Sequence, residues 1–308
     1  MSEPLVWLPF DPAELGETPS GLRFEVVDPT RHVPESVTEV EFYVTPYQMS
    51  PAVAEVLPTM TRLRVIQTLS AGVDNIRAAV PEGVTLCNGR GIHDTSTAEL
   101  ALTLTLASLR GIPGFVRNQD RHEWRGEVRP ALADKRVMIL GYGAIGSAIE
   151  ARLLPFETEV VRVARTARET DSGPVHGFDE LPALLPEVDV VILIVPLTEQ
   201  TRGLVDASFL AGMKDGALLV NMARGAVVVT ADLVAALGSG RISAAIDVAD
   251  TEPMPADHPL WDAPNLLISP HVGGASSAMW PRAYELVRQQ LERFANGEPL
   301  ANVMTGEY

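Results

Sequence analysis

The sequence predicts an α/β fold with two domains, one of them built on a doubly wound parallel sheet. Three observations lead to this prediction. A chain of 308 residues with 46% apolar residues is long and apolar enough for two cores. Short strand-like runs alternate with helical or loop segments along the chain, which is typical of parallel sheets. Near the middle, a strand-like run leads through a glycine-rich turn into a helix.

The glycine-rich turn has the sequence Gly-Tyr-Gly-Ala-Ile-Gly. The apolar run 137–140 before it predicts a strand buried on both faces, and residues 147–154 predict a helix. The first glycine can make the tight turn, the second leaves room for a pyrophosphate, and the third lets helix and strand approach closely. Free amides at the helix start would face the phosphates, although glycine turns also occur for structural reasons alone. The predicted dinucleotide site comprises Gly141, Tyr142, Gly143, Ala144, Ile145 and Gly146.

The amino-terminal part contains strand-like runs at residues 5–8, 24–27, 41–44, 65–69 and 85–87. This alternation predicts a small parallel α/β layer of its own. After the run 65–69 the chain passes through a turn made of Ser70, Ala71 and Gly72. The backbone amides of such a turn can bind a small anion such as a carboxylate. A plain strand-to-helix turn capped by Ser70 is the alternative.

A helix is expected at residues 100–109, where the sequence is almost wholly apolar. Ser96 and Glu99 fit a capping box, which predicts Ser96 as the residue that caps this helix. The following segment, residues 111–133, contains two prolines, four arginines and Trp124 and is expected to be irregular. An arm and a subunit contact both fit this composition.

After the glycine-rich turn, strand-like runs resume at residues 160–164, 188–195, 218–221, 244–248 and 266–269. Helical or turn-like segments separate them, notably residues 231–237, so a doubly wound sheet is the expected packing. A final helix is predicted at residues 279–295, and we expect it to cross back and complete the first layer.

Charge and composition exclude several classes of partner. The formal net charge of −16 argues against nucleic acid or an anionic membrane surface. The amino terminus lacks the features of a signal peptide, and no apolar run approaches about 18 residues, so we expect a soluble cytoplasmic protein. Cys87 is the only cysteine, which excludes an internal disulfide and a CxxC metal site. Its apolar neighbours predict a position in the core.

The tip of the run 160–164 indicates which dinucleotide is bound. An NAD site usually carries Asp or Glu there, about 20 residues after the first glycine, to hold the ribose hydroxyls. Here the tip carries Arg165, Thr166 and Arg168, which offer two cations and a hydroxyl suited to a 2′-phosphate. We predict a preference for NADP(H), with NAD(H) as a second cofactor. The alternative is that these arginines form only a solvated strand end.

Polar residues also follow three later strand-like runs. Arg224 follows the run 218–221, Glu252 comes shortly after the next run, and His271 follows the last. Because the carboxyl ends of parallel strands converge on the ligand crevice, these residues are expected to meet beside the cofactor. Arg can grip a carboxylate or ketone oxygen, His can exchange a proton, and Glu can orient the imidazole and raise its pKa. Singly, each could be a surface ion pair, a solvated acid or a loop histidine; jointly they predict a site.

The ordered motifs resemble the D-isomer-specific 2-hydroxyacid dehydrogenases, in particular their glyoxylate and hydroxypyruvate reductases. The likeness extends from about residue 40 to the end of the chain. It implies that Arg224 binds substrate and acts in catalysis, that His271 is the acid/base, and that Glu252 is the partner acid of His271. The motifs lie at residues 70–74, 141–146, 195–198, 220–225, 245–248, 251–253, 258–261, 269–274 and 296–302.

The resemblance also implies an architecture. Residues 1–93 and 275–308 would form a flavodoxin-like substrate domain, and residues 94–274 would form a Rossmann dinucleotide-binding domain inserted into it. The nucleotide domains would pair in a homodimer. The substrate carboxylate would lie on the turn formed by Ser70, Ala71 and Gly72. Contacts to the cofactor would include Pro196, Ala223 and Asp247, the last near the nicotinamide amide.

One position departs from the family pattern, and three others can be interpreted either as pocket walls or as core residues. Ala249 replaces the usual aromatic residue after Asp-Val, which would widen the site. Tyr47, Met279 and Trp280 are candidate pocket walls, and core packing explains each of them as well.

Single residues distinguish the expected function from competing ones. The family's formate enzymes lack the Glu beside their His, and amino-acid dehydrogenases commonly need a catalytic lysine. Lys135 and Lys214 are the only lysines, and neither is near the Arg, Glu and His segments. A nucleotide-sensing binding protein or corepressor on the same scaffold is the alternative from another class. A small 2-oxoacid is the expected substrate, with phosphoglycerate as the alternative.

Overall fold

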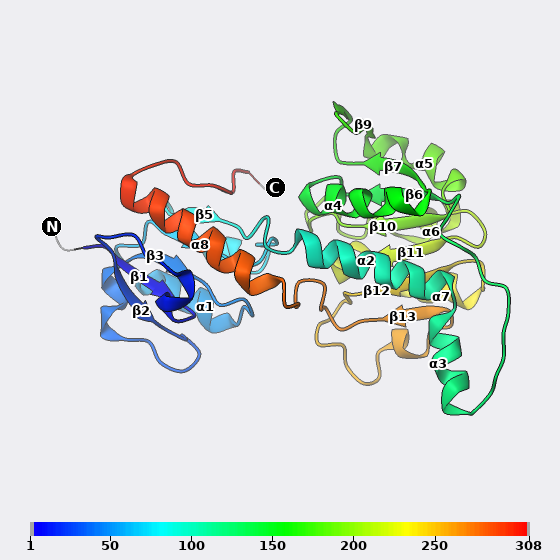
Figure 1. Cartoon of the computed structure of the whole chain (residues 1–308), viewed down its shortest axis with the longest axis horizontal. Helices are drawn as coiled ribbons and strands as arrows, with labels where there is room; N and C mark the ends of the chain where they lie inside the picture. The colour runs from blue at the N-terminus through cyan, green and yellow to red at the C-terminus, as the bar shows by residue number, and fades with distance from the viewer. Residues whose placement is uncertain (1–2, 307–308) are drawn as a thin grey trace. The chain divides into compact units, whose positions relative to one another are not determined.

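The computed structural model describes residues 3–306, and it confirms the predicted α/β fold class. The chain divides into two compact units (Figure 1). Unit 1 comprises Met1–His93 and Ser277–Tyr308, and unit 2 comprises Asp94–Ser276. Among residues 3–306, no helix combines the length and the apolar character that crossing a membrane requires.

Unit 1 contains a five-stranded parallel sheet in the order β2-β1-β3-β4-β5, which is the flavodoxin-like order. Four of its strands match the predicted runs to within one residue at each end, and β4 ends two residues early because the chain turns after Gln67. The strands are β1 (Leu5–Leu8), β2 (Arg23–Val26), β3 (Val40–Val44), β4 (Val65–Gln67) and β5 (Thr85–Cys87). Cys87 is fully buried, as predicted.

Helices cover the two faces of this sheet. On one face lies α8 (Met279–Asn296), whose apolar side chains recur every four residues and pack against Val6, Leu8 and Phe42. On the other face lie α1 (Pro51–Val56) and short 3₁₀ turns. The last helix therefore completes the first layer, as predicted. The buried α8 stripe consists of Met279, Ala283, Val287 and Leu291.

Unit 2 contains an eight-stranded sheet in the order β13-β12-β11-β10-β6-β7-β9-β8. All neighbouring strands are parallel except β8 and β9, which form an antiparallel hairpin. The chain builds outward from β6 to β7 on one side and then from β10 to β13 on the other. The strands are β6 (Arg136–Leu140), β7 (Glu159–Val163), β8 (Arg168–Thr170), β9 (Gly173–His176), β10 (Val190–Leu193), β11 (Leu218–Asn221), β12 (Ser243–Ile246) and β13 (Leu266–Ile268).

Both faces of the unit 2 sheet are buried, which explains why its strands are continuously apolar. In β6, Val137 and Ile139 join the core under α2 (Asp94–Leu109) and α4 (Ala144–Leu153). Met138 and Leu140 join the core on the opposite face. That face is covered by α5 (Leu181–Leu184), α6 (Ala207–Gly212) and α7 (Thr230–Gly238) (Figure 1).

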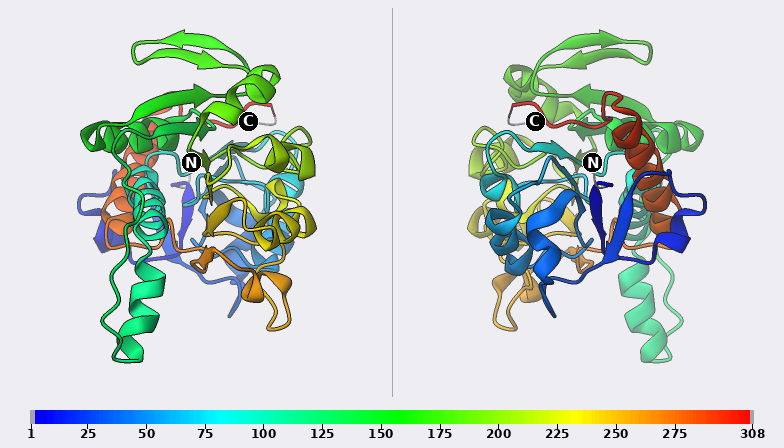
Figure 2. Two further views of the ribbon diagram at one scale, coloured as in Figure 1. Left: turned by 90° about the vertical axis from the view of Figure 1, so that its right-hand side faces the viewer. Right: turned by 90° about the vertical axis from the view of Figure 1, so that its left-hand side faces the viewer.

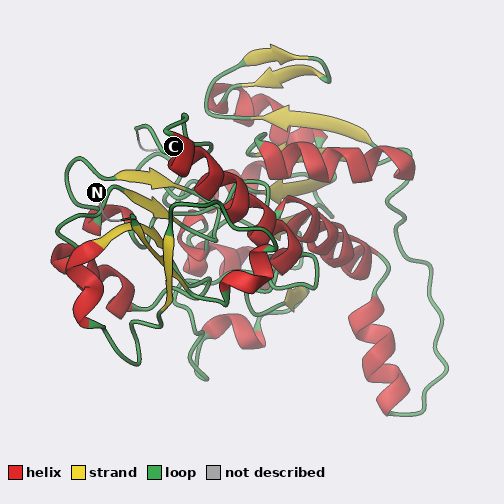
Figure 3. Ribbon diagram, turned by 60° about the vertical axis from the view of Figure 1, so that its left-hand side comes forward, coloured by secondary structure: helices red, strands yellow, loops and turns green. Residues whose placement is uncertain are grey.

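Two predictions about local structure were wrong. The helix expected after a Ser96 cap begins at Asp94, so Ser96 lies inside α2, and the acidic Asp94 suits the positive end of the helix dipole. The segment expected to be irregular begins with a helix, α3 (Ile112–Asp120), and only residues after it are irregular. Figure 3 shows α3 leading away from the sheet of unit 2 and an extended loop returning to β6.

The hairpin formed by β8 and β9 was not predicted. It follows β7 directly and pairs with it through β9. Figure 2 shows the hairpin standing out at the edge of the sheet beyond β7. It carries Arg168, one of the residues predicted to read the cofactor, on a strand rather than on a loose strand end.

Candidate active site

The predicted polar residues follow parallel strands of unit 2 and therefore lie along one edge of its sheet. β7 and β10 flank β6 on opposite sides, so the glycine-rich turn after β6 stands at the topological switch point. Ligands of open α/β sheets bind outside such a point. In sheet order, the row along this edge is His271, Asp247, Arg224, Pro196, the turn 141–146 and Arg165.

The three glycines of the turn have the steric roles that the sequence predicted. Gly141 has a φ of +115°, and a Cβ there would lie 2.5 Å from the carbonyl carbon of Ile194. A Cβ on Gly146 would lie 2.5 Å from the carbonyl oxygen of Gly141, so helix and strand could not approach as they do. A Cβ on Gly143 would meet no atom within 4 Å. This open space before the first amides of α4 fits a pyrophosphate.

Tyr142 differs from its neighbours in the turn because its side chain is buried in unit 2. Its hydroxyl donates a hydrogen bond to Glu150, and its amide donates to the carbonyl of Val163 at 3.1 Å. The Tyr142 carbonyl accepts a hydrogen bond of 2.6 Å from Nη2 of Arg168. The side chain of Tyr142 therefore faces the interior, whereas the prediction grouped it with the residues that contact the cofactor.

The three residues predicted to read the cofactor lie beyond the end of β7. Arg165, Thr166 and Arg168 are all exposed. The hydrogen bond to Tyr142 brings the Arg168 guanidinium to the glycine-rich turn and fixes one of its nitrogens there. A phosphate could accept hydrogen bonds from the remaining N–H groups of this guanidinium.

Arg224 is placed by a tight turn at the end of β11. The side-chain amide of Asn221, which is 1% exposed, accepts a hydrogen bond of 3.0 Å from the Ala223 amide and donates one of 3.2 Å to the Arg224 carbonyl. Nη1 of Arg224 donates to the Ala223 carbonyl at 2.8 Å. Asn221 was part of a sequence motif but had no predicted role; the structure shows that it shapes this turn.

The next residue, Gly225, brings the Arg224 turn against the loop that carries Glu252. A Cβ on Gly225 would lie 2.0 Å from the carbonyl carbon of Ala249 and 2.3 Å from the amide nitrogen of Asp250. No side chain can be accommodated at that distance. The two loops therefore touch through their backbones at this glycine.

Asp247 organises the loop that carries His271. Its carboxylate is 3% exposed and accepts hydrogen bonds from the Ser269 hydroxyl at 2.6 Å, the Val272 amide at 3.0 Å and the Gly273 amide at 2.8 Å. The Asp247 carbonyl accepts a further bond of 2.7 Å from the His271 amide. The resemblance assigned Asp247 to the cofactor, and the structure shows in addition that this residue holds the histidine loop.

His271 and Glu252 form a direct pair. Nδ1 of His271 lies 2.5 Å from Oε2 of Glu252, and Oε1 of Glu252 accepts a hydrogen bond of 2.9 Å from the Ala249 amide. The hydrogen bond to Glu252 raises the pKa of His271 and outweighs the opposing effect of burial. Burial acts to raise the pKa of Glu252, but the hydrogen bonds from His271 and Ala249 lower it overall. With Nδ1 held by Glu252, Nε2 is the nitrogen that can exchange a proton.

Arg224 lies within electrostatic range of this pair. Its charge contributes to lowering the pKa of Glu252 and opposes the rise in the pKa of His271. The structure therefore brings together the guanidinium, carboxylate and imidazole that the sequence predicted to meet. A cation, a fixed acid and an imidazole with a raised pKa form an arrangement that can polarise a carbonyl and protonate its oxygen.

In unit 1, the predicted carboxylate-binding turn has its carbonyls tied down. The Ser70 carbonyl accepts hydrogen bonds from the Gly89 amide and the Thr68 hydroxyl, both at 2.8 Å. Asn88 donates to the Ala71 carbonyl at 2.9 Å, and the Ser70 hydroxyl donates to the Gly72 carbonyl at 2.8 Å. Within residues 3–306, the amides of Ala71 and Gly72 donate no hydrogen bond. A bound carboxylate could accept hydrogen bonds from those two amides.

The three candidate pocket walls fall into different environments within unit 1. Met279 is 3% exposed and belongs to the core, so its packing role accounts for it. Tyr47 packs against the ring of His93 with 5.3 Å between ring centroids. Trp280 is 40% exposed and stacks on Tyr284 at 5.5 Å. Trp280 is therefore accessible to solvent and Tyr47 packs against another ring, whereas Met279 is buried in the core.

Several known proteins are similar to this chain. A glyoxylate reductase/hydroxypyruvate reductase from Homo sapiens is 33% identical over 251 residues, which cover 77% of this chain and 76% of that protein. A solved D-isomer specific 2-hydroxyacid dehydrogenase from Xanthobacter autotrophicus Py2, in complex with NADPH and MES, superposes with a TM-score of 0.84 at 29% identity. That match covers 99% of this chain and 98% of the Xanthobacter chain.

A third relative carries another activity. The NAD-dependent formate dehydrogenase from Staphylococcus aureus, in complex with NAD, superposes with a TM-score of 0.75 at 28% identity. The match covers 93% of this chain and 89% of the Staphylococcus chain.

The sequence profile of the D-isomer specific 2-hydroxyacid dehydrogenase NAD-binding domain matches residues 102–273, more than half of the chain. The chain therefore belongs to the D-isomer specific 2-hydroxyacid dehydrogenase family.

Proposed function

We propose that this protein interconverts small 2-oxoacids and D-2-hydroxyacids with a nicotinamide dinucleotide, as a glyoxylate or hydroxypyruvate reductase does. The observation that carries this proposal is the hydrogen-bonded pair of His271 and Glu252 with Arg224 in electrostatic range. Family membership supports it, as does the name of the human relative. The formate enzyme from Staphylococcus aureus shares the fold, but fold alone does not fix function.

The cofactor is proposed to lie along the sheet edge of unit 2, where it supplies the hydride for the reaction. The open space at Gly143 and the first amides of α4 fit its pyrophosphate. Arg165, Thr166 and Arg168 favour NADP(H) over NAD(H), because two cations suit a 2′-phosphate. The Xanthobacter neighbour holds NADPH and the Staphylococcus neighbour holds NAD, so we propose that NAD(H) is accepted as the second cofactor. Further proposed contacts are Pro196, Ala223 and Asp247.

In the reducing direction, each residue of the site has a separate task. The amides of Ala71 and Gly72 bind the substrate carboxylate, and the Arg224 guanidinium polarises the ketone oxygen. Protonated His271 then donates the proton on Nε2 to that oxygen as C2 is reduced. Glu252 stabilises the imidazolium through Nδ1 and keeps the ring oriented. In the oxidising direction, neutral His271 accepts the hydroxyl proton at Nε2.

A panel of 2-oxoacids tests the proposal. Purified protein would be assayed with NADPH and with NADH against glyoxylate, hydroxypyruvate, 3-phosphohydroxypyruvate and longer straight-chain 2-oxoacids. Oxidation of formate would be assayed separately with NADP⁺ and with NAD⁺. We expect at least one small 2-oxoacid to be reduced, with a higher kcat/KM for NADPH than for NADH. A higher kcat/KM for NADH would contradict the cofactor preference. Nucleotide binding without turnover of any substrate would instead indicate a nucleotide-sensing protein.

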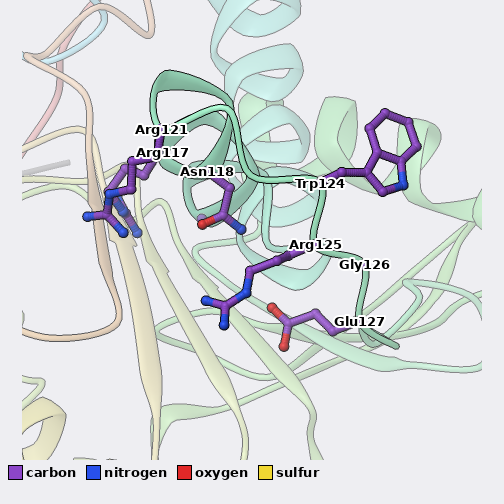
Figure 4. A pocket seen from close by; sticks show the side chains of 8 residues that line it. Arg117, Asn118, Arg121, Trp124, Arg125, Gly126 and Glu127 are labelled. Carbon is purple, nitrogen blue, oxygen red and sulfur yellow. The ribbon is translucent and has the colours of Figure 1, made fainter.

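We also propose that two copies of the chain associate through an arm formed by α3 and the following residues 121–131. Trp124 and Val128 in this arm are fully exposed. The arm encloses a hollow of about 570 Å³ lined by Arg117, Arg121 and Arg125, among others (Figure 4). Residues 111–131 carry four arginines and three acidic residues, whereas the whole chain has a formal net charge of −16. Exposed apolar side chains, on an arm that lacks the strong negative charge of the rest of the chain, suit contact with a second copy.

The oligomeric state tests this association. Analytical ultracentrifugation of the wild-type protein is expected to show a dimer, and replacing Trp124→Ser together with Val128→Ser is expected to weaken it. Val26→Ser is the matched control, because Val26 is 58% exposed on unit 1, outside the arm. A wild-type monomer at all concentrations, or a dimer equally stable in both variants, would contradict the proposal.

A further inference from the structure

Behind the glycine-rich turn of unit 2 lies a buried charged cluster that the proposed chemistry does not use. Glu150, in α4, is 4% exposed and accepts a hydrogen bond of 3.0 Å from Nε of Arg162, in β7. Nη2 of Arg162 bonds the other carboxylate oxygen, and the Tyr142 hydroxyl also donates to Glu150. The Arg162 guanidinium lies over the Tyr142 ring, 5.8 Å from its centroid.

A cluster of this kind is a weak source of stability. Removing a carboxylate and a guanidinium from water costs free energy that their attraction only partly offsets, and apolar residues of similar size often serve as well. The hydrogen bond to Glu150 raises the pKa of Arg162, so the guanidinium stays charged. What the cluster does provide is geometry, because a bidentate pair fixes the relative position of the two elements that carry it.

The elements fixed in this way are those of the proposed cofactor site. Glu150 lies one turn beyond Gly146 in α4, and Arg162 lies on β7, whose end carries Arg165. Tyr142 joins them from the glycine-rich turn itself. Its amide donates to the Val163 carbonyl at 3.1 Å and its carbonyl accepts from Arg168 at 2.6 Å, so both of its ends are tied to β7 and β8.

We propose that Tyr142, Glu150 and Arg162 are positioning residues for the dinucleotide. They set the pyrophosphate-binding turn relative to the arginines that face the ribose phosphate. This inference rests on the proposed cofactor site, but the three side chains of the cluster bond to one another in the interior of unit 2 and have no proposed role in the chemical step. Weakening it is therefore expected to loosen cofactor binding without slowing the chemical step once the cofactor is bound.

Glu150→Gln tests the proposal, because it removes the charge and keeps the shape. Glu41→Gln is a matched control: Glu41 is 7% exposed on β3 of unit 1 and is likewise paired with two arginines, Arg62 and Arg64. Both variants are expected to lower Tm. Only Glu150→Gln is expected to raise the Kd of NADPH and of NADH, each by about fivefold, which is the size of the effect of losing one ordinary hydrogen bond. At saturating cofactor its kcat is expected to stay within about twofold of wild type.

Tyr142→Phe keeps the experiment informative if Glu150→Gln folds poorly, because it removes a single oxygen atom. It is expected to raise both Kd values less than Glu150→Gln does. The double variant is expected to bind no more weakly than Glu150→Gln alone, since both changes break one network. Arg162→Lys, which keeps the charge, should bind the cofactor more tightly than Arg162→Met.

The outcomes separate this inference from the proposed function. If Glu150→Gln and Tyr142→Phe lower Tm as Glu41→Gln does but leave both Kd values unchanged, the cluster is structural and the inference is overturned. If the wild-type protein binds neither NADPH nor NADH, the proposed function fails first, and the inference fails with it.

Discussion

Nδ1 of His271 lies 2.5 Å from Oε2 of Glu252, although the two residues are 19 positions apart and follow different strands. Each partner is fixed from its own side. The Ala249 amide holds Glu252, and Asp247 holds the loop of His271 through its carboxylate and its carbonyl. The pair therefore meets without needing a ligand to assemble it.

Glu252→Gln is expected to shift the pH dependence of 2-oxoacid reduction to lower pH. The carboxylate raises the pKa of His271, so the imidazolium persists to higher pH in the wild type. Because reduction needs the proton on His271, its rate falls as pH rises through that pKa. Without the carboxylate the pKa of His271 drops, and the fall begins at lower pH. The measurement is kcat/KM for reduction across pH in both proteins; superimposable profiles would show that Glu252 does not tune His271.

Arg224→Lys is expected to lower kcat/KM for the 2-oxoacid by roughly 100-fold while leaving the Kd of the cofactor unchanged. Lysine keeps the charge but loses the planar fork that can bind an oxygen atom in a fixed orientation. Steady-state kinetics and nucleotide fluorescence would measure the two quantities. A change in cofactor affinity with normal kcat/KM at saturating cofactor would place Arg224 at the cofactor instead.

Gly225→Ala is expected to destabilise unit 2 by about 1–3 kcal/mol and to reduce activity. The new methyl group would sit 2.0 Å from the Ala249 carbonyl carbon, so the loop leading to Glu252 must move. Gly238→Ala is the control, because a Cβ there meets no atom within 4 Å and the position lies in α7. Thermal unfolding and kcat would be compared. Equal effects of the two substitutions would show that the contact between the loops is not needed.

Asp247→Asn is expected to lower kcat by about tenfold or more and to cost about 1–3 kcal/mol of stability. The carboxylate accepts hydrogen bonds from two backbone amides and a hydroxyl, and an amide nitrogen in place of one oxygen would face a donor. The loop that carries His271 would then shift. The expected shift of His271 can be followed by the NMR signal of its imidazole, and an unchanged signal with normal kcat would argue against this positioning role.

Much of the fold could be predicted because the signals were strong and local. The buried strands of unit 2 are apolar on both faces, and the turn after β6 has glycines at the spacing that its backbone contacts require. The joint placement of Arg224, Glu252 and His271 followed from a topological rule, since all three come after parallel strands of one sheet.

The features that were missed have specific causes. The hairpin of β8 and β9 is short, and the exposed Arg168 and Glu169 give no strand-like alternation. Helix α3 contains Pro113 and Gly114, which normally argue against a helix, but the proline stands in its first turn, where it is tolerated. Glu150 was overlooked because a glutamate in a helix is usually exposed; only tertiary structure shows that Arg162 and Tyr142 surround it.

The central claim is that His271 transfers the proton while C2 of the substrate is reduced. The most direct measurement is single-turnover oxidation of bound NADPH by glyoxylate or the best 2-oxoacid of the panel, comparing His271→Ala with wild type. The account predicts a rate about 10²–10⁴-fold lower in the variant, with the Kd of NADPH within about twofold of wild type. An unchanged single-turnover rate at saturating substrate would contradict it.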